Sequence, residues 1–169
     1  MKKILYLAII AASVISCTQK SENAATASDP HQFGSNYDST ANIDAVKATF
    51  ASIENYDTVG YASKYADTAK FHDNDKMTSL AENVNIQKQF IASGLKVKVK
   101  EGYPIWNSLF NFKDGTTGDY VYTYITVTFT KGDKSADVVM FQADRFNKDG
   151  KISEEWLVYD PANLNNLLK

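Results

Sequence analysis

Asp73 is a candidate proton acceptor in this 169-residue chain. It ends a short stretch, residues 69–73, that we expect to be a strand. A partly buried carboxylate at the mouth of a pocket could accept a proton, because burial disfavours the charged form and raises the pKa. The sequence from Asp73 to Asp75 is also typical of turns, so the competing interpretation is an ordinary turn acid. His72 cannot pair with Asp73 in a strand, since neighbouring side chains point to opposite faces. It is either a structural hydrogen-bonding group or a separate pocket residue.

The last predicted strand, residues 151–159, carries two adjacent acids and a tryptophan. Glu154 and Glu155 point to opposite faces, so only one of them can face an interior. Both faces of the strand are partly apolar, which leaves its pocket face unassigned. Trp156 is expected either in the core, which is the favoured interpretation, or as a platform for a ligand.

Composition and motifs exclude several classes of function. A formal charge of −2 without a basic block argues against nucleic-acid binding. Cys17 is the single cysteine, which excludes an internal disulfide and a multi-cysteine zinc site. Residues 147–150 superficially look like a calcium loop, but Arg145 and Trp156 stand where the first and last ligands would be. The sequence contains no phosphate-binding glycine motif, and we expect no metal and no cofactor.

The amino terminus predicts secretion and lipid anchoring. Residues 1–16 begin with two lysines and continue with an apolar run that is too short to span a bilayer, as in signal peptides. The run ends in Val-Ile-Ser before Cys17, which resembles the lipobox of bacterial lipoproteins. The resemblance implies cleavage before Cys17 and acylation there, with chains such as palmitate holding the protein at a membrane of the bacterial cell envelope. The alternative is an ordinary secretory signal with a chance cysteine.

A linker is predicted between this anchor and the folded domain. Residues 17–40 are rich in Ser, Ala, Asn and Thr and show no apolar period, which is typical of a flexible spacer. His31 is expected to be a solvated residue of this linker. No acidic run follows Cys17, so the choice of membrane and leaflet stays open.

Residues 41–169 are predicted to form one domain organised around the stretch 118–130. Odd-numbered residues there are largely aliphatic and even-numbered ones are tyrosines and threonines, which predicts a central antiparallel strand with one face in a core. The other face, with Tyr120, Tyr122 and Tyr124, is either an ordinary wet surface or the interface of a homodimer.

The remaining elements follow from apolar periodicity and caps. Asn42, Asp57 or Thr58, and Ser79 are the expected caps of three helices. The helices are predicted at 42–56, 57–65 and 79–93, and further strands at 95–100, 103–112 and 136–146.

Helices followed by an antiparallel meander resemble the nuclear transport factor 2-like superfamily, which includes ketosteroid isomerases and SnoaL-like polyketide cyclases. The resemblance covers residues 43–168, and its best local matches are residues 55–69 and 146–161. It implies a cone-shaped α+β fold, in which three N-terminal helices pack in a strongly curved, mainly antiparallel sheet with a pocket at the open end.

Aligned without gaps, the stretch from Tyr65 to Asp73 lies along the isomerase segment that ends in the general base, so Asp73 falls on that base. Thr49 falls on the oxyanion-hole tyrosine, and Gln142 falls near the protonated acid that assists it. A hydroxyl and an amide are weak donors for this task, which argues against steroid isomerisation. A resemblance to the cyclases would instead make Asp160 the candidate acid. The predicted pocket residues are Thr49, Tyr65, His72, Gln142 and Trp156.

Two functions follow. The favoured one is a membrane-anchored, non-catalytic module that binds a small apolar ligand or an interaction partner, with few polar groups converging in its pocket. The alternative is an isomerase- or cyclase-type enzyme that uses Asp73 or Asp160 as general acid or base.

Overall fold

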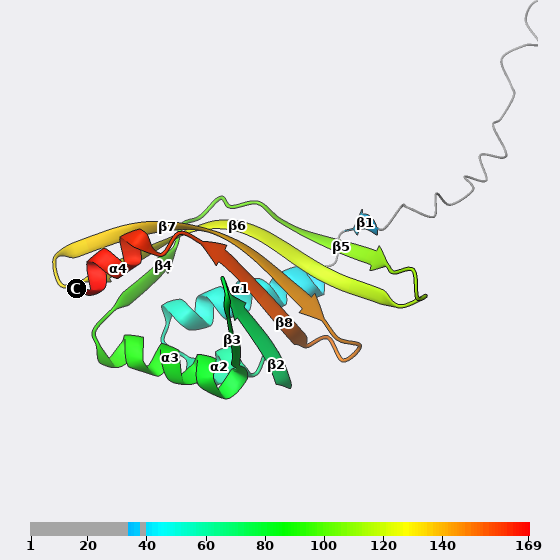
Figure 1. Cartoon of the computed structure of the whole chain (residues 1–169), viewed down its shortest axis with the longest axis horizontal. Coiled ribbons are helices and arrows are strands. Elements are labelled where there is room, and N and C mark those ends of the chain that lie inside the picture. Colours follow the sequence, from blue (N-terminus) through cyan, green and yellow to red (C-terminus); the bar gives the residue numbers. More distant parts are fainter. Residues whose placement is uncertain (1–33, 38–39) are drawn as a thin grey trace, which may run out of the picture. The chain divides into compact units, whose positions relative to one another are not determined.

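The computed structural model describes residues 34–37 and 40–169 (Figure 1). The predicted signal peptide, Cys17 and His31 lie outside the described residues. Among the helices that are described, none is long and apolar enough to cross a membrane.

An eight-stranded sheet dominates the described chain, in the order β1-β5-β6-β7-β8-β2-β3, with β4 pairing on β6. Only the β2–β8 contact is parallel among these pairings, so the sheet is mainly antiparallel, as predicted. The long strands β6 and β7 bend over α1 (Figure 1). The strands are β1 (Gly34–Tyr37), β2 (Tyr65–Asp73), β3 (Lys76–Ser79), β4 (Lys96–Val99), β5 (Ile105–Asn111), β6 (Thr117–Lys131), β7 (Lys134–Phe146) and β8 (Ile152–Tyr159).

Three helices precede the long antiparallel strands and lie on one side of the sheet, which we call the concave face (Figure 1). They are α1 (Thr40–Glu54), α2 (Thr58–Ala62) and α3 (Leu80–Ala92). α1 buries Val46 and Phe50, part of the predicted apolar stripe. Asn42 lies inside α1, so its assignment as the cap is wrong, and its side chain instead donates to Asp119 at 3.0 Å.

The caps of the other two helices are as predicted. The Asp57 side chain accepts from the Gly60 backbone N–H at 2.8 Å and begins α2, which ends three residues earlier than expected. Ser79 and Glu82 form a capping box at the start of α3. No side chain of α3 is buried, so this helix covers the concave face loosely.

The structure differs from the prediction in four short elements. β1 lies within the stretch predicted as a flexible linker. It pairs with β5 through backbone hydrogen bonds, which an apolar pattern in the sequence does not predict. β2 begins at Tyr65, four residues earlier than predicted. β3 joins Lys76, which was expected in a turn, to Ser79, which was expected to begin a helix. The C-terminal tail forms α4 (Ala162–Leu168), which buries Leu164 and Leu167.

The hydrophobic core lies between the concave face and α1 and α2. Alternation along β6 is as predicted, since Val121, Ile125, Val127 and Phe129 are buried while Tyr124 is 54% exposed. Helix α2 and strand β2 add a cluster of three aromatic rings, Tyr61, Tyr65 and Phe71.

Candidate active site

Four polar side chains meet on the concave face inside this core, and we call them the acid cluster: Tyr65, Gln142, Asp144 and Glu155. Strand pairing brings them together, because Asp144 of β7 stands opposite Glu155 of β8 and Gln142 lies two residues from Asp144 on the same face. Tyr65 reaches the same point from the start of β2. Asp144 is fully buried, and Gln142 and Glu155 are nearly so.

Glu155 is the centre of the hydrogen bonding in the acid cluster. The Tyr65 hydroxyl donates to its Oε2 at 2.5 Å, and Gln142 Nε2 donates to the same oxygen at 3.3 Å. The Gln142 amide also donates to Asp144 Oδ2 at 2.9 Å, and strand pairing places the Asp144 and Glu155 side chains next to each other. Each side chain of the cluster thus makes at least one hydrogen bond, whereas Asp144 Oδ1 has no partner among the described residues.

The two carboxyl groups differ in their affinity for a proton. Burial raises the pKa of Asp144 well above its ordinary value, and the charge of Glu155 raises it further. Burial raises the pKa of Glu155 to about 7, against hydrogen bonds from Tyr65 and Asp144 that favour its charged form. Burial therefore favours the protonated form of Asp144, and Glu155, with a pKa of about 7, is close to half ionised at neutral pH.

Asp73 lies beside the acid cluster but is not its centre. Its charge contributes to the raised pKa of Glu155, and its Oδ2 accepts a hydrogen bond from the Tyr159 hydroxyl at 3.3 Å. Thr49 is buried in α1, where its hydroxyl donates to the Val46 carbonyl at 2.7 Å. Of the residues predicted for one pocket, the structure brings Tyr65 and Gln142 together.

His72 and Trp156 lie on the opposite, outer face of the sheet. Their rings stack at 5.2 Å, and His72 Nε2 lies 2.8 Å from Glu154 Oε1. The strand alternation that carries Glu155 inward carries Glu154 and Trp156 outward, and His72 of β2 stands opposite Trp156. The predicted pocket residues His72 and Trp156 therefore cannot reach the acid cluster.

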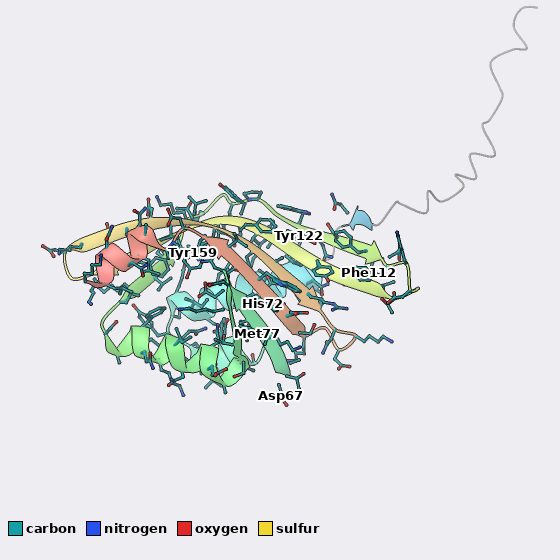
Figure 2. All side chains as sticks on the ribbon, in the orientation of Figure 1. Asp67, His72, Met77, Phe112, Tyr122 and Tyr159 are labelled. Carbon is teal, nitrogen blue, oxygen red and sulfur yellow. The ribbon has the colours of Figure 1, made fainter. Side chains whose placement is uncertain are left out.

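The outer face also carries the predicted tyrosine ladder. Tyr120 stacks on Tyr122 at 6.0 Å and Tyr122 on Phe141 at 5.8 Å, and Trp106 lies 5.6 Å from Tyr122. Tyr122 is labelled in Figure 2. Tyrosine-rich surfaces of this kind suit protein contacts, since the rings offer apolar area and the hydroxyl groups tolerate water.

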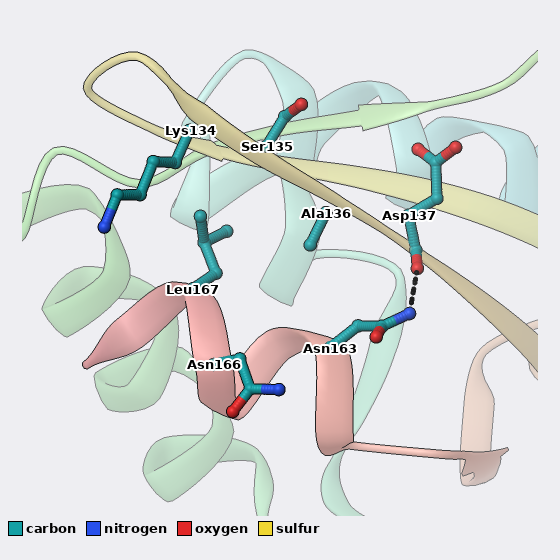
Figure 3. Close-up of a pocket in the computed structure, with 7 residues that line it drawn as sticks. All are labelled: Lys134, Ser135, Ala136, Asp137, Asn163, Asn166 and Leu167. Carbon is teal, nitrogen blue, oxygen red and sulfur yellow. Dashed lines mark hydrogen bonds between the residues drawn. The ribbon is translucent and has the colours of Figure 1, made fainter.

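Asp160 is exposed at the end of β8, and its Oδ1 accepts from the Ala162 backbone N–H at 2.9 Å. Close by, an open groove of about 590 Å³ lies between α4 and the start of β7 (Figure 3). Asn163 donates there to the Asp137 carbonyl at 3.2 Å, as Figure 3 shows. None of the side chains that line the groove belongs to the acid cluster.

Asp144 and Glu155 were not among the predicted catalytic residues. The signal for Asp144 was present, because Gln142 and Asp144 interrupt the buried face of an otherwise apolar strand. The signal for Glu155 was hidden by a bulge, since Arg145 pairs with Glu154 and Phe146 with Ile152, leaving Ser153 unpaired. Ile152 and Glu155 therefore both face inward, which simple alternation forbids. No group of three or more metal-binding side chains occurs in the part of the chain that is described.

Comparisons with known proteins give the fold and no more. No family model matches the chain, and no curated protein matches it. Among solved structures, an LEH-like epoxide hydrolase of M. tuberculosis superposes with a TM-score of 0.58 at 16% identity, over 76% of this chain and 90% of the other.

Two further structures agree. A nuclear transport factor 2-like protein of unknown function from Burkholderia pseudomallei has a TM-score of 0.59 at 13% identity, over 78% of this chain and 99% of the other. TerC, crystallised with polyporic acid, has a TM-score of 0.56 at 16% identity, over 76% of this chain and 98% of the other. The chain thus has the α+β fold of the nuclear transport factor 2-like proteins.

Proposed function

We propose that this domain is an acid–base enzyme that adds water to a small, uncharged electrophile, with Glu155 as general base and Asp144 as general acid. The observation that carries the proposal is the buried pair of neighbouring carboxyl groups: the pKa of Asp144 is raised well above its ordinary value, and that of Glu155 is raised to about 7. A general base works best when its pKa lies near the working pH, because it is then both available and basic enough.

The chemistry follows from the shared proton. Two adjacent carboxyl groups that hold one proton between them can activate a water molecule, as aspartic protease dyads do. Glu155 takes a proton from water while the water oxygen attacks carbon. Asp144 gives its proton to the oxygen that leaves that carbon. The new proton on Glu155 then passes to the neighbouring Asp144, which restores the starting state.

An epoxide is the electrophile that this scheme fits best. Opening its ring needs one proton accepted from water and one delivered to the ring oxygen, and it releases a single diol. The LEH-like epoxide hydrolase with a similar fold supports this choice, although at 16% identity it shares only the fold. Proton transfer next to a carbonyl, the isomerase- or cyclase-type alternative, uses one base and one acid in the same way.

The test is hydrolysis of styrene oxide and cyclohexene oxide in ¹⁸O-labelled water, with diol detected by mass spectrometry. We expect one labelled oxygen per diol and a fall of about 10²-fold or more in kcat/KM for Glu155→Gln and for Asp144→Asn. Glu154→Gln is the matched control, since it removes a carboxylate from the same strand on the opposite face.

Two results would reject the proposal. One is no diol from either epoxide together with no exchange of α-protons in a panel of ketones. The other is diol formation that survives both acid-cluster substitutions.

Anchoring at Cys17 is the second part of the proposal, and the lipobox-like residues before this cysteine support it. Chains acylated at Cys17 would sediment with bacterial membranes and incorporate an alkyne analogue of palmitate, whereas Cys17→Ser would do neither. Equal labelling of both chains would remove the anchor. The non-catalytic binding module is less well supported, because it called for few converging polar groups and the concave face holds four.

A further inference from the structure

A second cavity opens at the end of the sheet where α1 begins, and neither the sequence patterns nor the comparisons assign it a role. We call it the entrance cleft; its volume is about 540 Å³, within the range of small-molecule sites. Its walls come from α1, from the ends of β5 and β6, and from the β7–β8 hairpin. The residues used below are Asn42, Leu109, Asp119, Arg145, Phe146 and Lys148.

Strand register places the entrance cleft next to the acid cluster. Leu109, Asp119 and Phe146 form one row across β5, β6 and β7, and all three line the cleft. The next row on the same face is Asn107, Val121 and Asp144, two residues further along each strand. Two residues of a strand span about 6.6 Å, so the floor of the cleft lies one side-chain row from Asp144.

A hydrogen-bonded bridge separates the two sites. Asp119 accepts from Asn42 at 3.0 Å and from Asn107 at 2.6 Å, which ties α1 to β5 across the inner end of the cleft. Beyond the bridge, Asn107 Oδ1, Thr123 Oγ1 and Asp144 Oδ1 are buried and make no hydrogen bond within the described chain. Buried polar atoms of this kind need a partner, and hydroxyl groups from water or a ligand would supply it.

The inner and outer ends of the route from the entrance cleft to the acid cluster differ in charge. Every buried polar side chain of the described residues is neutral or acidic, so the inner end offers nothing to balance an anion. At the outer end, Lys148 and Arg145 line the rim. The Arg145 side chain is engaged on the outer face, 3.8 Å from Glu154 and 6.0 Å from the centre of the Tyr120 ring, whereas Lys148 is exposed and available to the cleft.

We infer that the entrance cleft is the substrate site of the acid cluster and that it takes a small carboxylic acid whose reacting end is uncharged. The carboxylate meets Lys148 at the rim, and the apolar body passes Leu109 and Phe146 toward Asp144. The inference about the reacting end of the ligand rests on the proposed function, whereas the inference that the acid binds at the cleft does not.

Binding is measured first, with three probes of equal length: octanoate, octanol and octylammonium. Chemical shifts are followed by NMR in the full-length chain and in Glu155→Gln, which removes the proposed base without touching the rim. We expect octanoate to bind most tightly and octylammonium most weakly in both proteins. Lys148→Gln should weaken octanoate two- to fivefold at low salt, the range of one exposed ion pair, and leave octanol unchanged. Lys134→Gln, which removes a lysine from the α4 groove, is the matched control.

Catalysis is measured second, with 7,8-epoxyoctanoate and 1,2-epoxyoctane. Lys148→Gln should raise KM for the acid alone and leave kcat unchanged. The inference is overturned if octylammonium binds as tightly as octanoate, if Lys148→Gln changes all three probes equally, or if none of them shifts residues of the cleft. Octanoate binding at the cleft without hydrolysis of either epoxide would instead retain the inference about the site and reject the proposed reaction.

Discussion

Glu155→Gln tests the electrostatics of the buried pair without any substrate. The pKa of Glu155 is about 7 in the folded chain against an ordinary value of 4.5, so the folded state binds this proton more tightly than the unfolded state does. A raised pKa of this sign stabilises the fold fully below pH 4.5, and the stabilisation is lost as pH rises through about 7. At 1.36 kcal/mol per pH unit, the loss is about 3 kcal/mol.

Glutamine keeps an oxygen that can accept from the Tyr65 hydroxyl and carries no charge at any pH. We therefore expect Glu155→Gln and the unsubstituted chain to have similar free energies of unfolding near pH 4.5. At pH 8 the variant should be more stable, by up to about 3 kcal/mol. Urea unfolding followed by tryptophan fluorescence between pH 4.5 and 8.5 measures both values.

Glu101→Gln is the control, because Glu101 is exposed and carries the same substitution. A difference between Glu155→Gln and the unsubstituted chain that stays constant across this pH range would refute the reasoning. A variant that is less stable at pH 8 than at pH 4.5, relative to the unsubstituted chain, would refute it more strongly.

Three further predictions concern the scaffold. Ser79→Ala should lower the free energy of unfolding by about 1 kcal/mol and speed amide exchange in the first turn of α3, since the capping box is lost; unchanged exchange would contradict this. Leu167→Ala should cost about 2–3 kcal/mol in urea unfolding, because this side chain docks α4 on the core, and a loss under 1 kcal/mol would mean that α4 is not packed. If the outer face joins two copies of the chain, Tyr122→Glu should elute later than the unsubstituted chain in size-exclusion chromatography, and an identical elution position would remove the dimer.

The sequence predicted the elements whose local signals agree with their packing. Burial along β6 alternates from Val121 to Phe129, and Ser79 and Glu82 satisfy the start of α3 within four residues. α4 was not predicted, because a helix of seven residues carries little periodicity and its stability comes from the packing of Leu164 and Leu167. β1 was not predicted for a related reason, since its pairing with β5 depends on backbone groups that every sequence possesses.

The acid cluster shows a different limit. Gln142 and Tyr65 were found through resemblance, but Glu155 needed the register of β8, and the unpaired Ser153 resets that register by one residue. A one-residue change moves every side chain to the other face, so an alternation counted from Ile152 puts Glu154 inside and Glu155 outside. Sequence periodicity carries no information about such a bulge.

Stability alone does not explain why this core retains two acids. Replacing a buried polar pair by apolar side chains of similar volume is often neutral or stabilising, and here the pair also leaves Asp144 Oδ1 without a partner among the described residues. Strongly shifted pKa values gather at functional sites for this reason, because there the cost in stability is offset by chemistry. The double substitution Asp144→Leu with Glu155→Met should therefore unfold at a higher urea concentration than the unsubstituted chain at pH 8, and it should form no diol. A double variant that is both less stable at pH 8 and still active would show that the acids serve the fold and not a reaction.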